Sequence, residues 1–173
     1  MNITLTAGHS TEAPGAVYAG LKEADLAAEL CRKCVAELVV RGHAVKTDAK
    51  PGFNLPLSDA IKMIAGSDMA MEIHFNAAAD GTVGGTECVS LPKDKAKAQA
   101  LAQATSAALG TKLRRDKGWL PQEQSAHGKL AYVVAGGIIL EVSFLSNAND
   151  RALYAANKSA LVVALCNTIE KIC

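Results

Sequence analysis

Four residues of this chain have side chains that could bind a metal ion or move a proton, and their spacing follows the predicted elements. Three apolar, strand-like runs carry His9, His74 and Glu141 at their C-terminal ends, and Glu23 opens the first long helical pattern. Two imidazoles and one carboxylate can fill three positions around zinc and leave the fourth for water. A second carboxylate beside that water would serve as the base of a hydrolase.

The remaining residues predict the elements that would bring these side chains together. Polar and apolar residues alternate in 2–7 and 68–76, which is typical of strands. Further strands are expected at 43–48, 86–91, 130–134 and 137–144, and helices at 22–41, 57–66, 93–109 and 149–173. Ligands of open α/β sheets bind beyond the carboxyl ends of the strands, so the site is expected at that edge.

The order of these elements predicts the fold class. Strands and helices alternate along the 173 residues without a linker, repeat or low-complexity segment. This favours a single α/β domain over residues 1–173, with a twisted, mostly parallel (mixed) sheet of about six strands and helices on both faces. The irregular stretches 76–85 and 110–130 are candidate substrate walls, because binding loops sit on rigid scaffolds.

Composition excludes several classes of partner. Half of the residues are hydrophobic and the formal net charge is only +1, so no basic patch indicates a nucleic acid or an anionic membrane. No apolar run approaches the roughly 20 residues that span a bilayer, and the N-terminus lacks the basic region of a signal peptide. The odd cysteine count, with Cys31 and Cys34 inside a helical pattern, favours reduced, packed thiols.

Four segments resemble the signatures of one enzyme family. "GHSTEAPGA", the glutamate that opens the next helix, "EIHFNA" and "LEVSFLSN" are similar to those of zinc-dependent N-acetylmuramoyl-L-alanine amidases of the amidase-3 type. The resemblance covers nearly the whole chain in order. It implies a zinc ion (Zn2+) held by His9, Glu23 and His74, with Glu141 as the catalytic residue and Asn76 and Glu87 as substrate-binding residues.

The resemblance also implies the reaction and its setting. The substrate would be peptidoglycan, cleaved at the amide between the lactyl group of N-acetylmuramic acid and L-alanine of the stem peptide. A wall hydrolase without a signal peptide or a separate cell-wall-binding domain resembles a phage endolysin. We therefore expect a monomer that is made in the cytoplasm and acts on the cell wall, in the host periplasm, after release.

The chain departs from the family pattern at three places. Ser10 stands where the family usually has a second glycine, and Glu72 stands where it commonly has serine. The short helix 57–66 lacks the usual arginine. Because residues two apart on a strand share a face, we expect Glu72 to lie beside His74 and to orient it.

Position alone leaves the third ligand and the activity open. His9 and Glu12 form the H-x-x-E spacing of zinc carboxypeptidases, so a carboxypeptidase-like peptidase is an alternative, and only the resemblance selects Glu23. A non-catalytic peptidoglycan-binding module on the same fold is a second alternative, although all four chemical residues are intact.

Other residues have open roles: His127, Trp119 and the basic cluster Lys112, Arg114, Arg115 and Lys117, which indicates a solvated face or a contact to stem-peptide carboxylates.

Overall fold

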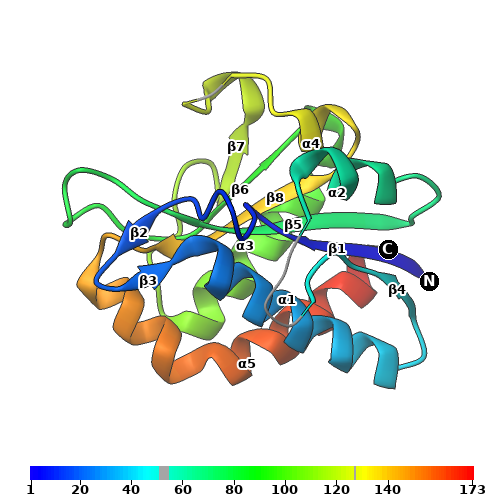
Figure 1. Ribbon diagram of the computed structural model, residues 1–173, viewed down its shortest axis with the longest axis horizontal. Helices are drawn as coiled ribbons and strands as arrows, with labels where there is room; N and C mark the ends of the chain where they lie inside the picture. Colours follow the sequence, from blue (N-terminus) through cyan, green and yellow to red (C-terminus); the bar gives the residue numbers. More distant parts are fainter. Residues whose placement is uncertain (51–54, 127) are drawn as a thin grey trace.

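The computed structural model describes residues 1–50, 55–126 and 128–173, and its centre is a six-stranded mixed sheet (Figure 1). The strands lie in the order β4 (Ala44–Lys46), β1 (Asn2–Ala7), β5 (Met69–Asn76), β8 (Ile138–Phe144), β6 (Glu87–Ser90) and β7 (Trp119–Pro121). Neighbouring strands are parallel except β6 and β8, which are antiparallel. The predicted fold class is confirmed.

Helices cover both faces of the sheet (Figure 1). Three long helices lie on one face: α1 (Glu23–Val40), α3 (Lys95–Leu109) and α5 (Ala148–Ile172). The other face carries α2 (Leu57–Met63) and α4 (Ala131–Val134). The shorter elements are the hairpin β2 (Val17–Tyr18) and β3 (Leu21–Lys22), and the 3₁₀ turns η1 (Pro92–Asp94) and η2 (Gln122–Gln124).

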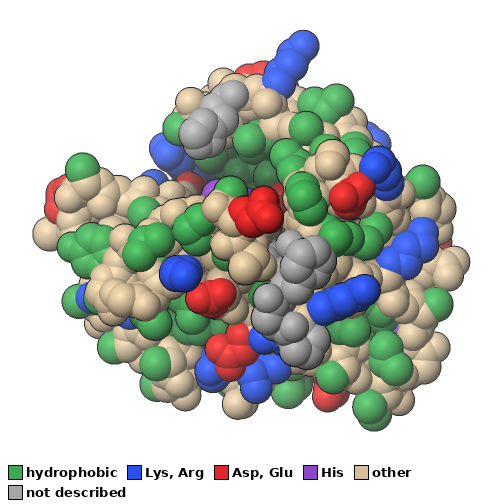
Figure 2. Space-filling model, in the orientation of Figure 1, with side chains coloured by type: hydrophobic (Ala, Val, Ile, Leu, Met, Phe, Trp, Pro, Cys, Tyr) green, Lys and Arg blue, Asp and Glu red, His purple; other side chains and the backbone are tan. Residues whose placement is uncertain are grey.

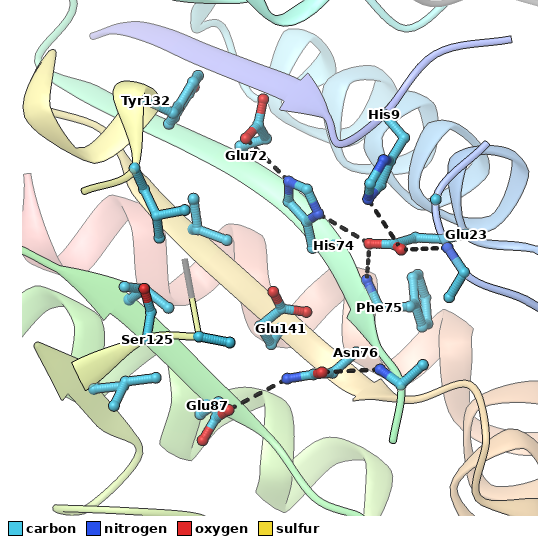
Figure 3. A pocket seen from close by; sticks show the side chains of 18 of the residues that line it. His9, Glu23, Glu72, His74, Phe75, Asn76, Glu87, Ser125, Tyr132 and Glu141 are labelled. Carbon is cyan, nitrogen blue, oxygen red and sulfur yellow. Dashed lines mark hydrogen bonds and ion pairs between the residues drawn. The ribbon is translucent and has the colours of Figure 1, made fainter. Parts of the chain in front are cut away.

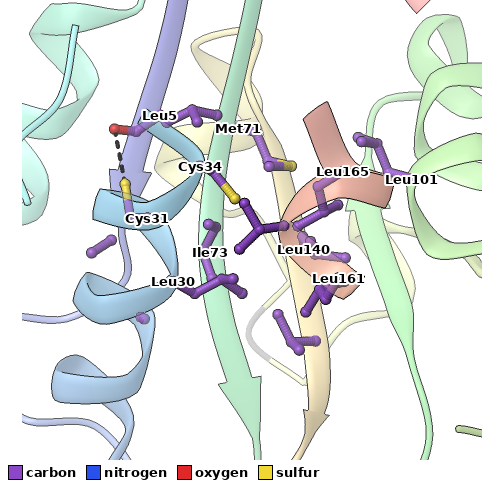
Figure 4. Close-up of a cluster of buried hydrophobic side chains, with 14 of the residues drawn as sticks. Leu5, Leu30, Cys31, Cys34, Met71, Ile73, Leu101, Leu140, Leu161 and Leu165 are labelled. Carbon is purple, nitrogen blue, oxygen red and sulfur yellow. Dashed lines mark hydrogen bonds between the residues drawn. The ribbon is translucent and has the colours of Figure 1, made fainter. Parts of the chain in front are cut away.

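The main core fills the layer between the sheet and the three long helices. Its members are mostly aliphatic side chains and thiols, such as Leu30, Ile73 and Leu140, all fully buried (Figure 4). Cys31 donates a hydrogen bond to the Leu5 carbonyl at 3.3 Å, and burial raises the pKa of its thiol to about 12. Four cysteines are buried and free, which confirms the prediction of reduced, packed thiols: Cys31, Cys34, Cys88 and Cys166.

Two predicted elements are wrong. The run 130–134, expected to be a strand, contains the short helix α4. Just after this helix, the Gly137 amide donates a hydrogen bond to the Tyr132 carbonyl. Conversely, Trp119–Pro121 lies in the stretch expected to be irregular, yet it pairs with β6 as a parallel edge strand. Short apolar runs fit either structure, so periodicity could not distinguish them.

Helix α5 is long and apolar enough, by length and composition alone, to be a candidate membrane span. An 18-residue window of this 25-residue helix reaches a mean hydropathy of 1.2, and 33% of that window is buried. Leu161, Leu165 and Ile169 on this helix are fully buried in the main core, beside α1 and α3. One apolar face packed on a sheet is typical of a core helix.

Candidate metal centre

The sheet register aligns three of the candidate residues in one row. His74 on β5 is the register partner of Glu141 on β8, and Glu141 is the partner of Glu87 on β6. Adjacent strands lie about 4.8 Å apart, and the row crosses three strands, near the carboxyl end of β5 and at the middle of β8. The expected convergence of strand ends therefore occurs (Figure 3).

A pocket of about 810 Å³ opens over this row, on the face that carries α2 and α4. Its floor includes acidic side chains, and part of its wall is apolar, contributed by Leu57, Leu120, Leu130 and Ile139. Figure 2 shows the surface hollowed beneath the upper lobe, with a histidine side chain visible in the hollow. Such a concave site with a few convergent polar groups suits a small part of a larger substrate.

Among the described residues, His9, Glu23 and His74 form a group that could hold a metal ion, with one donor atom from each lying within 4.8 Å of the others. Glu23 joins the two imidazoles: its Oε2 lies 3.0 Å from His9 Nε2 and its Oε1 lies 2.9 Å from His74 Nδ1. The backbone amides of Ala16 and Phe75 also donate to this carboxylate, at 3.0 and 3.1 Å.

Glu23 is held in its ionised form. Its side chain is buried, and burial alone would raise the pKa of the carboxyl. Hydrogen bonds to His74 and His9 outweigh that effect and lower the pKa to about 2. The group therefore carries a negative charge between the imidazoles across the physiological range.

Two glycines allow the donors to approach one another. A Cβ atom at Gly8 would lie 2.3 Å from Cε1 of His74, and one at Gly15 would lie 2.4 Å from Cδ2 of His9. Gly15 also has φ +70°, and His9 itself lies in the left-handed region with φ 66°. Two imidazole nitrogens and a carboxylate oxygen in so tight a cradle fit a zinc ion.

Glu72 contacts His74, as expected from its place on the strand. Its Oε2 lies 3.0 Å from Nε2 of His74, and the side chain is buried. Burial would lower the pKa of His74, but Glu23 and Glu72 together raise it well above its ordinary value. Both ring nitrogens are thereby held by carboxylates, which fixes the imidazole plane.

One carboxylate oxygen of Glu141 is unsatisfied in the part of the chain that the structure describes. Its Oε2 is fully buried and accepts no hydrogen bond from the described residues. Burial raises the pKa of the carboxyl to about 7, against the opposing effect of the neighbouring His74. A buried, unpaired carboxylate oxygen is costly and therefore indicates a function.

Asn76 and Glu87, the two predicted substrate-binding residues, lie together in the pocket. Glu87 is buried, and its Oε1 accepts a hydrogen bond from Asn76 Nδ2 at 3.3 Å. Its Oε2 accepts from Nε of Arg114 at 3.0 Å and from Nε of Arg115 at 3.2 Å. The sequence left these arginines open between a solvated face and a substrate contact; the structure puts both on the pocket wall.

Two further residues that the sequence left open, Trp119 and Glu12, are not among the described residues that line the pocket. Trp119 donates its Nε1–H to Ser90 Oγ at 3.0 Å and packs under Lys95, whose Nζ lies 4.5 Å from the ring centroid. It covers the sheet edge and is not among the described pocket residues. Glu12 is exposed and is not part of the metal-binding group. His127 lies outside the described residues.

Comparisons with known proteins identify the family of the chain. A family model described as N-acetylmuramoyl-L-alanine amidase matches residues 3–171. A protein of Neisseria meningitidis assigned to the same activity is 42% identical, with a TM-score of 0.88 over 97% of this chain and 93% of its own.

Two more distant structures share the fold. The catalytic domain of the amidase CwlV of Bacillus (Paenibacillus) polymyxa is 20% identical, with a TM-score of 0.84 over 99% of this chain and 97% of its own. The amidase AmiC2 of Nostoc punctiforme is 18% identical, with a TM-score of 0.80 over 99% of this chain and 96% of its own. No curated protein matches the sequence significantly. Since the family model covers nearly all of it, the chain belongs to the N-acetylmuramoyl-L-alanine amidase family.

Proposed function

We propose that this amidase is a zinc enzyme that cleaves peptidoglycan between the lactyl group of N-acetylmuramic acid and L-alanine of the stem peptide. The observation that carries the proposal is the convergence of donor atoms from His9, Glu23 and His74 within 4.8 Å, in one pocket with the unpaired oxygen of Glu141. Family membership supports the choice of amide bond.

The residues of the chain divide into two roles. Zinc held by the three ligands would act as a Lewis acid toward the substrate carbonyl and would lower the pKa of water. Glu141 takes the proton from the attacking water and returns it to the leaving amine. A pKa of about 7 suits a group that must both accept and release a proton near neutral pH.

The proposal is tested on isolated peptidoglycan with and without a chelator. We expect the purified protein to release free amino termini of L-alanine, to stop when zinc is chelated, and to recover when zinc is added back. Release that persists in the chelator would contradict the zinc mechanism. No release by zinc-loaded protein would contradict the amidase reaction and would favour a non-catalytic binding module.

Changing Glu72 to glutamine should weaken zinc binding without removing a ligand. The variant keeps the size of the side chain but loses the charge that orients the His74 imidazole at 3.0 Å. We expect zinc affinity to fall by about 10- to 100-fold, measured by competition with a chromophoric chelator.

The matched control for Glu72→Gln is Glu123→Gln, because Glu123 is an exposed carboxylate on η2. This control should bind zinc like the wild type. Unchanged zinc affinity in Glu72→Gln would remove the orienting role of Glu72 and leave the contact as a structural one.

The cellular setting remains our proposal. We infer that the enzyme works as a monomeric endolysin that is made in the cytoplasm and reaches the wall after release. Family membership supports this use on the cell wall. A neighbouring gene for a membrane-disrupting protein would favour it, whereas secretion of the protein by a bacterium would contradict it.

A further inference from the structure

The pocket has one cationic end. Its described lining includes four carboxylates, and its lysine and arginine side chains are only Arg114 and Arg115, next to Glu87. Away from the proposed metal centre, these carboxylates would repel an anionic group of a substrate. The position of the arginines therefore fixes where such a group can lie.

The two arginines differ in how far their hydrogen-bonding capacity is used. Arg114 donates from Nε to Glu87 and from Nη1 to the Gly84 carbonyl at 3.2 Å, and its guanidinium lies 4.7 Å from the Phe144 ring centroid. Arg115 donates only from Nε to Glu87, at 3.2 Å, and its side chain is 49% exposed. Its Nη1 and Nη2 atoms make no hydrogen bond to the described residues.

The net charge of Glu87, Arg114 and Arg115 also indicates that this end of the pocket can bind an anionic group. Glu87 offers one negative charge to two guanidinium groups, so the cluster keeps a charge of about +1 on the pocket wall. The bond from Nε to a buried carboxylate holds the guanidinium plane of Arg115, while its two terminal nitrogens remain available. A planar fork of this kind binds a carboxylate in a bidentate manner.

The distance from the metal centre selects the part of the substrate. His74, Glu141 and Glu87 occupy three adjacent strands, so Glu87 lies about 10 Å from His74 at about 4.8 Å per strand. An extended peptide covers roughly 3.5 Å per residue. A stem peptide that starts at the metal centre and crosses Glu141 therefore reaches Arg115 within its first two or three residues.

We propose that Arg115 binds a free carboxylate on the second residue of the stem peptide and so determines which wall chemistry the enzyme prefers. The inference rests on the proposed function, because it assumes that the scissile amide lies at the metal centre. Glu87 is a positioning residue, since it accepts the hydrogen bond that holds the guanidinium of Arg115, and Arg114 binds the same carboxylate oxygen.

The test uses two muramyl tripeptides that differ only at the α-carboxyl group of the second residue, which is a free carboxylate in one and a carboxamide in the other. We expect wild-type enzyme loaded with zinc to prefer the carboxylate by about 10- to 100-fold in kcat/KM, chiefly through KM. Arg115→Ala should bring this ratio close to one, and Arg115→Lys should keep part of it.

Lys117→Ala is the matched control, because Lys117 lies in the same exposed segment and shares the left-handed backbone, with φ 51° against 52° for Arg115. It does not line the pocket, so the ratio should stay at the wild-type value. An equal loss on both tripeptides in Arg115→Ala, or an unchanged ratio, overturns the inference. If zinc-loaded wild type cleaves neither tripeptide, the proposed function itself fails.

Discussion

Replacing Glu141 by glutamine should reduce kcat by about 10³-fold while zinc binding is retained, as measured by L-alanine release and by metal titration. Glutamine keeps the shape of the side chain but cannot accept the proton of the attacking water. The ligand atoms of His9, Glu23 and His74 do not depend on Glu141, so the metal centre should remain intact.

A second measurement separates loss of chemistry from loss of fold. Oε2 of Glu141 accepts no hydrogen bond from the described residues, so the substitution breaks no bond there. The free energy of unfolding should therefore change by no more than about 1 kcal/mol. A variant that keeps kcat within tenfold of the wild type would exclude Glu141 as the proton carrier, and a variant that unfolds would reveal a structural role.

The substitution Glu23→Gln should reduce zinc affinity by at least about 100-fold and abolish activity, whereas Glu12→Gln should change neither. Glu23 lies between both imidazoles, with its oxygens 2.9 and 3.0 Å from them. Glu12 is exposed in the loop after His9. Metal content after gel filtration and chelator competition measure the difference. The opposite result, with zinc lost only in Glu12→Gln, would support the carboxypeptidase-like ligand set.

Thermal unfolding gives an independent check on the same pair. A ligand that binds only the folded state stabilises it by about 4 kcal/mol at 1,000 times its Kd. Zinc should therefore raise the Tm of the wild type and of Glu12→Gln to the same extent. The Tm of Glu23→Gln should rise only slightly with zinc, because zinc would no longer bind the folded state much more tightly than the unfolded state.

The long elements could be predicted from the sequence because their patterns are strong. The alternation in 68–76 and the helical spacing after Glu23 each extend over enough residues to identify the element. The short elements could not be predicted in this way. Tyr132 is buried, and its residue type suits an inward position in either a strand or a helix. Strand β7 has only three residues, too few to show a period. Tertiary contacts decide such segments, and those contacts are not local in the sequence.

The candidate site was predictable to the extent that its residues lie at strand ends. Topology brings His74 and Glu141 together, and strand position implied the contact of Glu72 with His74. The pairing of Arg114 and Arg115 with Glu87 was not predictable, because it joins a strand to a loop 27 and 28 positions later. Charged residues in a loop follow no period in the sequence that would indicate which residue they contact in the folded protein.

Strand β8 is the last strand in the sequence, yet it lies between β5 and β6. During synthesis, the segments that carry both imidazoles emerge long before the segment that carries the proton acceptor. Under the proposed mechanism, a nascent chain would contain the metal donors before it contains Glu141, and it should not hydrolyse the substrate until β8 is inserted in register. The strand order thus implies that the enzyme is inactive while it is being synthesised. Two separately expressed fragments, divided before β8, should likewise be inactive until they associate.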